Sequence, residues 1–255
     1  MKPLAVVISL QRTPERLAWF RAVNGSQAAT VQTVAGVDGV ELEPLLQHTR
    51  LIDQSGLASW SRGAIGAALS HLLCWRRCAE SDRPLLVLED DVVLAHDWVA
   101  QLDQLCASLN ERWDLVLLGW NYNSVLRSVD ASGSETTSLF EPAYPNLDQI
   151  HRIINPPFPL GRQIKRLRNG FGLPAYVISP ACARQLLSEV PPLQTKRITV
   201  SRGIPVVDAL TLDGLLNRIY WSIGAYVVDP PLAVAINDPT TSLTQQSHCQ
   251  VSFSG

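Results

Sequence analysis

Three consecutive carboxylates, Glu89, Asp90 and Asp91, form the clearest chemical signature of this chain. They follow the apolar run 85–88, whose residues are typical of a buried strand. A buried strand cannot hold three adjacent charges, so we expect it to end at Glu89 with the acids at its carboxyl edge. Carboxylates suit Mg2+ or Mn2+, which commonly take their remaining ligands from water and phosphates. The triplet therefore indicates a metal and diphosphate site, and the alternative is an acidic turn that caps the next helix.

The first two expected strands also lead into polar residues. Residues 4–10 form a β-branched run suited to a buried parallel strand, and residues 13–15 supply a cap, a proline and an acid for a helix to about Val23. Residues 30–34 form a second strand, followed by a glycine-containing turn with Asp38. Asp38 either contacts a ligand or closes an Asx turn. Ligands bind at the carboxyl edge of open α/β sheets, so this turn is a candidate site.

Residues 62–75 predict a helix with a face of small residues, which permits close approach by a neighbouring backbone or a ligand. Its apolar stripe consists of Ile65, Leu69, Leu72 and Leu73. Ser70 and His71 are the polar pair embedded in this stripe. In isolation, His71 is either a satisfied structural histidine or a ligand contact.

Strand and helix alternate up to residues 113–119, which is the signature of a layered α/β fold. The pattern breaks in residues 120–170, which we expect to form an irregular lid or binding loop. At its root, Trp120 and Tyr122 either stack on a sugar ring or pack in the core. Near its end lies a basic cluster that forms either a solvated helix face or a contact with anionic lipid or phosphate: Arg162, Lys165, Arg166 and Arg168.

Regular structure is expected again after this segment. Residues 171–178 predict a strand, and Ser179 with the following proline starts a helix to about Val190. Residues 204–208 introduce another helix that we expect to continue to about Tyr220, with Asp208 in its first turn, where the helix dipole favours an acid.

The composition excludes several classes of protein. A chain of 255 residues with 17% charged residues and no long low-complexity tract can bury a large core, and a net charge of -2 argues against nucleic acid as the main partner. Five cysteines without a CxxC pair favour a reducing compartment. No apolar run reaches the ~20 residues of a spanning helix, and residues 1–16 contain no signal-peptide cleavage pattern. We therefore expect a soluble, cytoplasmic protein with at most peripheral membrane contact.

Taken in order, these fragments resemble glycosyltransferase family 25, which includes bacterial lipooligosaccharide galactosyl- and glucosyltransferases and the collagen galactosyltransferase domains of animals. The resemblance covers most of the chain and rests on the order and spacing of short motifs within residues 8–16, 37–39, 63–75, 87–91, 113–119, 175–179 and 205–208.

The resemblance implies an α/β protein with a GT-A-type, Rossmann-like fold, in which helices flank a mixed, mostly parallel central sheet. It implies a single domain over residues 1–255. Residues 1–119 would bind the nucleotide sugar, residues 120–170 would form an acceptor loop or lid, and residues 171–255 would form the acceptor side.

The resemblance also implies a UDP-sugar donor and Mn2+ or Mg2+ as the cofactor. Asp91, with Asp90 or Glu89, would hold the metal on the diphosphate. Leu10, Arg12 and Asp38 would line the nucleoside pocket, and Ser70 and His71 would face the donor. The donor-binding set is therefore Leu10, Arg12, Asp38, Ser70, His71, Glu89 and Asp90.

Members of the family are expected to invert the anomeric carbon, so a carboxylate must take a proton from the attacking acceptor hydroxyl. The metal-bound acids lie on the leaving-group side, and the resemblance gives this role to Asp208, with Asp213 as the alternative. Asp238 or His248 would supply a third metal ligand. Two departures from the family leave the donor sugar open: residues 172–174 lack the usual Gly-Thr, and residues 241–243 lack the usual acid.

The predicted activity is the transfer of galactose or glucose from a UDP-sugar to a hydroxyl of a lipopolysaccharide or related glycan, at the inner face of a bacterial cytoplasmic membrane. A non-catalytic nucleotide- or glycan-binding module on the same fold is the first alternative. A sugar nucleotidyltransferase is the second, but such enzymes usually carry a glycine-rich phosphate loop after the first strand, and residues 11–16 contain no glycine.

Overall fold

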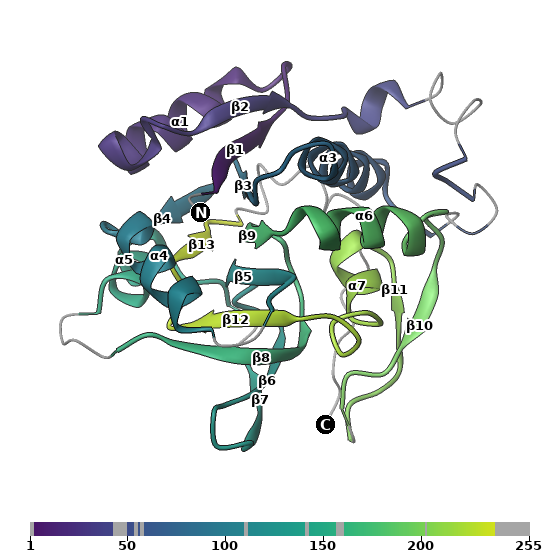
Figure 1. Cartoon of the computed structure of the whole chain (residues 1–255). Helices are drawn as coiled ribbons and strands as arrows, with labels where there is room; N and C mark the ends of the chain where they lie inside the picture. Colours follow the sequence, from purple (N-terminus) through teal and green to yellow (C-terminus); the bar gives the residue numbers. More distant parts are fainter. Residues whose placement is uncertain are drawn as a thin grey trace.

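The structure is a computed structural model that describes residues 3–42, 50–53, 56, 59–109, 112–140, 143–156, 161–201 and 203–237. In these ranges a nine-stranded sheet forms the centre of the molecule (Figure 1). Its strands, in spatial order, are β2 (Gln32–Ala35), β1 (Leu4–Ser9), β3 (Leu85–Glu89), β9 (Ala175–Ile178), β5 (Leu115–Gly119), β12 (Ala225–Asp229), β8 (Gln163–Gly170), β6 (Val125–Val129) and β7 (Glu135–Leu139).

The strands β2, β1, β3, β5 and β12 run in one direction. The pairs β1–β2, β1–β3 and β5–β12 are parallel, and β9 lies antiparallel between β3 and β5. The remaining strands, β8, β6 and β7, are joined by antiparallel pairings. The carboxyl ends of β1, β3 and β5 therefore meet at one edge, and the predicted mixed α/β sheet is confirmed.

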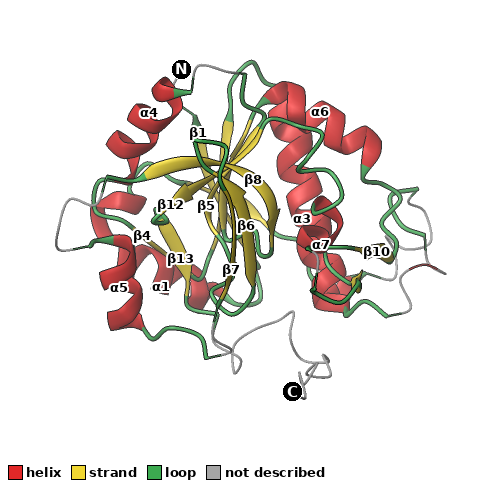
Figure 2. Cartoon of the chain, turned by 90° about the horizontal axis from the view of Figure 1, so that it is seen from below, coloured by secondary structure: helices red, strands yellow, loops and turns green. Residues whose placement is uncertain are grey.

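Helices cover both faces of the sheet (Figure 2). One face carries α1 (Pro14–Asn24), α4 (Trp98–Ser108) and α5 (Leu147–Ile154), and the other carries α3 (Arg62–Ala79), α6 (Pro180–Glu189) and α7 (Leu212–Leu216). Leu86 and Leu88 of β3 face the first helix layer, and Leu85 and Val87 face the second. This alternation explains why the central strands are apolar along their whole length.

Smaller elements complete the described chain. They are the 3-10 helices η1 (Gly25–Ala28) and η2 (Gly39–Glu41), the antiparallel pair β4 (Val92–Leu94) and β13 (Ala233–Ala235), and the antiparallel pair β10 (Lys196–Ile198) and β11 (Val207–Ala209). In the same ranges, no helix combines the length and apolar character needed to cross a membrane. The described cysteines are free thiols: Cys74, Cys78, Cys106 and Cys182.

Two expectations about secondary structure were wrong. Residues 120–170 contain β6, β7, α5 and β8, because short polar strands of a hairpin give little hydrophobic signal. The helix expected to begin near Asp208 and continue to about Tyr220 is limited to α7, and its N-cap is Thr211. Asp208 lies in β11, so Asp213 occupies the first helical turn in its place.

Candidate functional site

The ends of β1 and β2 bring Leu10, Arg12 and Asp38 together. Ser9 and Ala35 are register partners, so the two loops leave the sheet side by side. The Arg12 Nε donates to Asp38 Oδ2, and Asp38 Oδ1 accepts the Val40 amide at 2.9 Å. Asp38 therefore does close an Asx turn, and its second oxygen is held by Arg12.

Burial opposes the ionisation of Asp38, but the Val40 amide and the Arg12 guanidinium outweigh it and hold the pKa below its usual value. Leu10 lies beside this turn, since a Cβ at Gly36 would come within 2.9 Å of Leu10 Cδ2. Leu10, Arg12 and Asp38 thus lie together at the edge of the sheet, where they combine an apolar side chain with an ion pair. Nucleoside binding by these residues stays a prediction.

Ser70 fixes the loop that carries Asp38. Its hydroxyl accepts the Val37 amide at 2.8 Å and donates to the Gly66 carbonyl at 2.8 Å, and the residue is only 2% exposed. Gly66 permits this approach, because a Cβ there would lie 2.6 Å from the Val37 oxygen. Both hydroxyl bonds are made inside the protein, and the predicted contact of Ser70 with the donor stays a prediction.

His71 lies behind the acidic triplet. Its ring is 3% exposed, with Nδ1 3.0 Å from the Tyr176 hydroxyl and Nε2 3.3 Å from Glu89 Oε1. The hydroxyl of Tyr176 also accepts the Trp75 indole N–H at 2.8 Å. The histidine therefore links the core of the molecule to the first acid of the triplet.

Asp90 forms an ion pair with Arg16 of helix α1. The Arg16 Nε donates to Asp90 Oδ1 at 2.8 Å, and another nitrogen of the same guanidinium lies 3.4 Å from Asp91 Oδ2. Burial alone would lower the pKa of Arg16, but the charges of Asp91 and Asp90 outweigh it and raise the pKa. Asp90 is therefore neutralised within the protein.

Asp91 and Glu89 each keep one carboxylate oxygen that no described residue binds. Among the described residues, Asp91 Oδ1 is buried without a hydrogen-bond partner, and burial together with the charge of Glu89 raises the pKa of Asp91 to about 7. The Glu89 side chain is 37% exposed. A cation at this position would satisfy the orphaned oxygen and reduce the repulsion between the two carboxylates.

These residues fit a divalent cation whose remaining ligands come from a substrate and from water. Within the described residues no group of three or more His, Cys, Asp and Glu side chains forms a metal cage. Mg2+ and similar ions are commonly held by one or two carboxylates plus phosphate oxygens and water. The sequence left the companion of Asp91 open between Asp90 and Glu89, and because Arg16 binds Asp90 more closely than Asp91, the geometry favours Glu89.

The sequence model of one protein family, described as glycosyltransferase family 25 (LPS biosynthesis protein), matches residues 3–201. The chain belongs to glycosyltransferase family 25. The suspected resemblance is thereby confirmed, and with it a general assignment as a glycosyltransferase.

Other comparisons add little to this assignment. No curated protein matches the chain. Among solved structures, the inositol-1-phosphate CTP transferase from T. maritima is similar, with a TM-score of 0.44 and 11% identity, over 94% of this chain and 91% of that chain.

The two candidate bases of this glycosyltransferase occupy different environments. The Asp208 side chain is exposed on β11 and makes no hydrogen bond or ion pair with a described residue. Asp213 Oδ2 accepts the Gly172 amide at 2.6 Å. Gly172 has a φ of +86°, and the Pro174 oxygen two residues later accepts the Glu89 amide at 2.9 Å. Asp213 thus supports the turn that leads to the acids.

Sequence reasoning missed two residues of the site in this family 25 chain. Arg16 lies in the first turn of α1, where a cation opposes the helix dipole, and this mismatch was a signal that it has an acidic partner. Tyr144 had no such signal. Burial raises the pKa of its hydroxyl, and the charges of Asp91 and Glu89 raise it further, so the hydroxyl lies in the field of the acids.

The aromatic pair at the root of segment 120–170 belongs to the core. Trp120 is 1% exposed, and its ring stacks on Tyr122 with centroids 5.5 Å apart. Phe140 packs against both rings, at 6.1 Å and 4.9 Å. Of the two alternatives for Trp120, core packing is the one the structure supports.

The basic cluster lies mainly on a strand, not on a helix. Lys165 pairs with Asp229 at 2.5 Å, and Arg166 lies over the Tyr226 ring at 5.2 Å. Arg162 donates to the Ile154 carbonyl and to a glutamine side chain. Internal contacts therefore hold at least three of the four basic residues.

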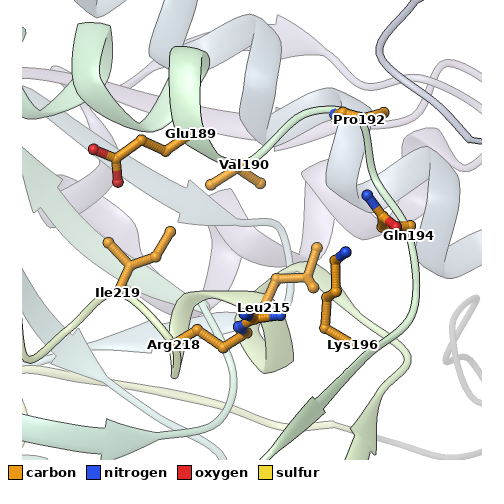
Figure 3. A pocket seen from close by; sticks show the side chains of 8 residues that line it. All are labelled: Glu189, Val190, Pro192, Gln194, Lys196, Leu215, Arg218 and Ile219. Carbon is orange, nitrogen blue, oxygen red and sulfur yellow. The ribbon is translucent and has the colours of Figure 1, made fainter.

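Several predicted features lie outside the described residues, namely Asp238, residues 241–243, His248 and Cys249. A cavity of about 250 Å³ lies beside α7, between the end of α6 and β10 (Figure 3). Its lining consists of Glu189, Val190, Pro192, Gln194, Lys196, Leu215, Arg218 and Ile219. None of the predicted site residues lines this cavity, and the acids and the Arg12–Asp38 pair lie at the carboxyl edge of β1, β2 and β3.

Proposed function

We propose that this glycosyltransferase moves galactose or glucose from a UDP-sugar to a hydroxyl group of a lipopolysaccharide or related glycan, with inversion at the anomeric carbon and with Mn2+ or Mg2+. The observation that carries the proposal is the buried Oδ1 of Asp91, which has no hydrogen-bond partner in the described part of the chain, beside the partly exposed Glu89. Both lie at the same sheet edge as the Arg12 and Asp38 pair, since β1 pairs in register with β2 and β3.

Asp91 and Glu89 would hold the divalent ion, and its chemistry there is to stabilise the charge that grows on the departing diphosphate. Asp90 contributes indirectly, because its bond with Arg16 keeps the turn between β3 and β4 in place. Leu10, Arg12 and Asp38 would bind the nucleoside.

Asp208 is the proposed base. A base must be free to accept the proton of the acceptor hydroxyl, and the exposed carboxylate of Asp208 meets that requirement. Asp213 meets it less well, because the Gly172 amide occupies one of its oxygens. We therefore assign Asp213 to holding the turn at 172–174.

The proposed acceptor is a glycan or glycolipid at the inner face of the cytoplasmic membrane, which the enzyme would contact peripherally. The description of the family as an LPS biosynthesis protein supports this class of acceptor. A non-catalytic binding module remains the second candidate, favoured by the internal use of Ser70 and Asp90.

The experiment is a UDP-release assay with UDP-galactose, UDP-glucose and, as controls, GDP-mannose and a CMP-sugar. The acceptor is lipopolysaccharide core extracted from a strain that lacks this protein. The proposal expects release from one UDP-hexose only, and a product with the anomeric configuration opposite to that of the donor by NMR. UDP binding by calorimetry without turnover on any donor would favour the binding module, and a retained configuration would contradict inversion.

A further inference from the structure

A buried series of hydrogen-bonded side chains connects α3, β9 and β3, and its last member is the partly exposed Glu89. It runs from Trp75 on α3 to Tyr176 on β9, from there to His71 on α3, and from His71 to Glu89 at the end of β3. The successive separations are 2.8 Å from the indole nitrogen to the hydroxyl, 3.0 Å to Nδ1, and 3.3 Å from Nε2 to the carboxylate. Trp75 and Tyr176 are fully buried.

The protons of this series can be assigned one at a time. The Trp75 indole N–H is only a donor, so the Tyr176 oxygen accepts it. The single hydroxyl proton of Tyr176 then has one remaining partner in the described part of the chain, which is His71 Nδ1. Nδ1 is therefore an acceptor, and the neutral ring carries its proton on Nε2, directed at Glu89 Oε1.

The other neutral tautomer of His71, with its proton on Nδ1, does not satisfy these hydrogen bonds. It would leave the Tyr176 proton without an acceptor in a fully buried position, which is unfavourable. It would also direct the lone pair of Nε2 at a carboxylate oxygen 3.3 Å away. The burial of Trp75 and Tyr176 thus selects one tautomer of His71, and that tautomer donates to Glu89.

We propose that Tyr176 and His71 are positioning residues, which hold one oxygen of Glu89 so that the other is presented to the metal and diphosphate. The proposal rests on the proposed function, in which Glu89 serves the cation. Hydrogen bonds from outside the ligand shell orient metal-binding carboxylates, and their loss typically lowers metal affinity or activity about 10-fold to 100-fold. The inference explains why the buried His71 contacts Glu89, a side chain that is 37% exposed.

The first test needs no activity. Two-dimensional 15N NMR of the metal-free protein reports the tautomer of each histidine, and the His71 signals are assigned by their loss in His71→Gln. The proposal expects a protonated Nε2 and an unprotonated Nδ1. A protonated Nδ1, alone or together with Nε2, would overturn it.

The second test measures the affinity for UDP in the presence of Mn2+. His71→Leu should weaken it about 10-fold or more, and His71→Gln, whose side-chain amide can still donate to Glu89, should recover most of the loss. Tyr176→Phe should weaken it as well and should mix the tautomers of His71. His96→Gln, at an exposed histidine, is the matched control and should change nothing.

The outcomes separate the two proposals. If the wild-type protein binds UDP without regard to Mn2+, the metal site of the proposed function is contradicted. If the wild type binds UDP with Mn2+ and folded His71→Leu binds it equally well, the positioning role is contradicted. Melting curves of each variant show whether it is folded.

Discussion

Arg16 and Asp90 are joined at 2.8 Å between Nε and Oδ1, so a residue of α1 neutralises the middle acid of the triplet. The Asp90 side chain is 8% exposed and the pair is largely shielded from solvent. The same guanidinium also lies 3.4 Å from Asp91 Oδ2, and His71 contacts Glu89 Oε1, so Asp91 and Glu89 each keep their other oxygen for a ligand.

Asp90→Asn should therefore lower stability more than it lowers binding. The asparagine keeps an oxygen that can accept from Arg16, but it removes the negative charge opposite a shielded guanidinium, which costs about 1 to 3 kcal/mol in the free energy of unfolding. Urea denaturation measures this change, with Asp148→Asn at an exposed position as the control. An unchanged urea midpoint for Asp90→Asn would show that the pair does not stabilise the fold.

Asp208→Asn and Asp213→Asn should differ in kcat, because Asp208 is the proposed base and Asp213 only holds the turn at 172–174. Asp208→Asn should reduce kcat at least about 100-fold, within the usual contribution of a general base, while UDP affinity stays the same. Asp213→Asn can still accept the Gly172 amide, and its loss in kcat should be much smaller. Initial rates and UDP calorimetry decide, and loss of UDP binding in Asp208→Asn would reassign that residue to the donor site.

Asp38 should make stability depend on acid pH. Its pKa in the folded protein lies below the ordinary 3.8, because the Val40 amide and Arg12 outweigh the effect of burial. The ionised group thus stabilises the fold above its unfolded pKa, and this contribution disappears as the pH falls through the folded pKa. The difference in unfolding free energy between wild type and Asp38→Asn should be constant near neutral pH and vanish in acid. A difference that grows in acid would contradict the assignment.

Gly66→Ala should loosen the loop that carries Asp38. Its Cβ would lie 2.6 Å from the Val37 backbone oxygen, so α3 and the loop must move apart at a cost of about 1 to 3 kcal/mol. The KM for the donor should rise more than kcat falls. Gly161→Ala, where the new Cβ meets nothing within 4 Å, is the control. Equal KM values for both variants would argue against a donor role of this loop.

The sequence predicted the elements whose signal is local. Long apolar runs ended by Glu89 and Gly119 gave β3 and β5, and Ser179 capped α6 as expected by accepting the Cys182 amide. These predictions succeeded because buried strands and helix caps depend mainly on neighbouring residues, although Thr13, the expected cap of α1, makes no side-chain hydrogen bond with a described residue.

The sequence did not reveal the contacts between site residues that lie far apart along the chain. Arg16 and Asp90 are 74 residues apart, and Tyr176 is 105 residues from His71, so no local pattern connects them. The position of Asp208 was wrong for a related reason: β11 pairs with β10, and no local pattern in the sequence reveals this pairing.

The central claim is that Asp91 serves a divalent cation on a UDP-sugar. The most direct measurement is UDP release from the accepted donor over a range of Mn2+ concentrations, after treatment with EDTA, for wild type, Asp91→Asn and the control Asp148→Asn. Wild type and Asp148→Asn should regain full activity on addition of Mn2+, and Asp91→Asn should remain at least about 100-fold slower at every concentration. Turnover in EDTA, or full activity of Asp91→Asn, would contradict the account.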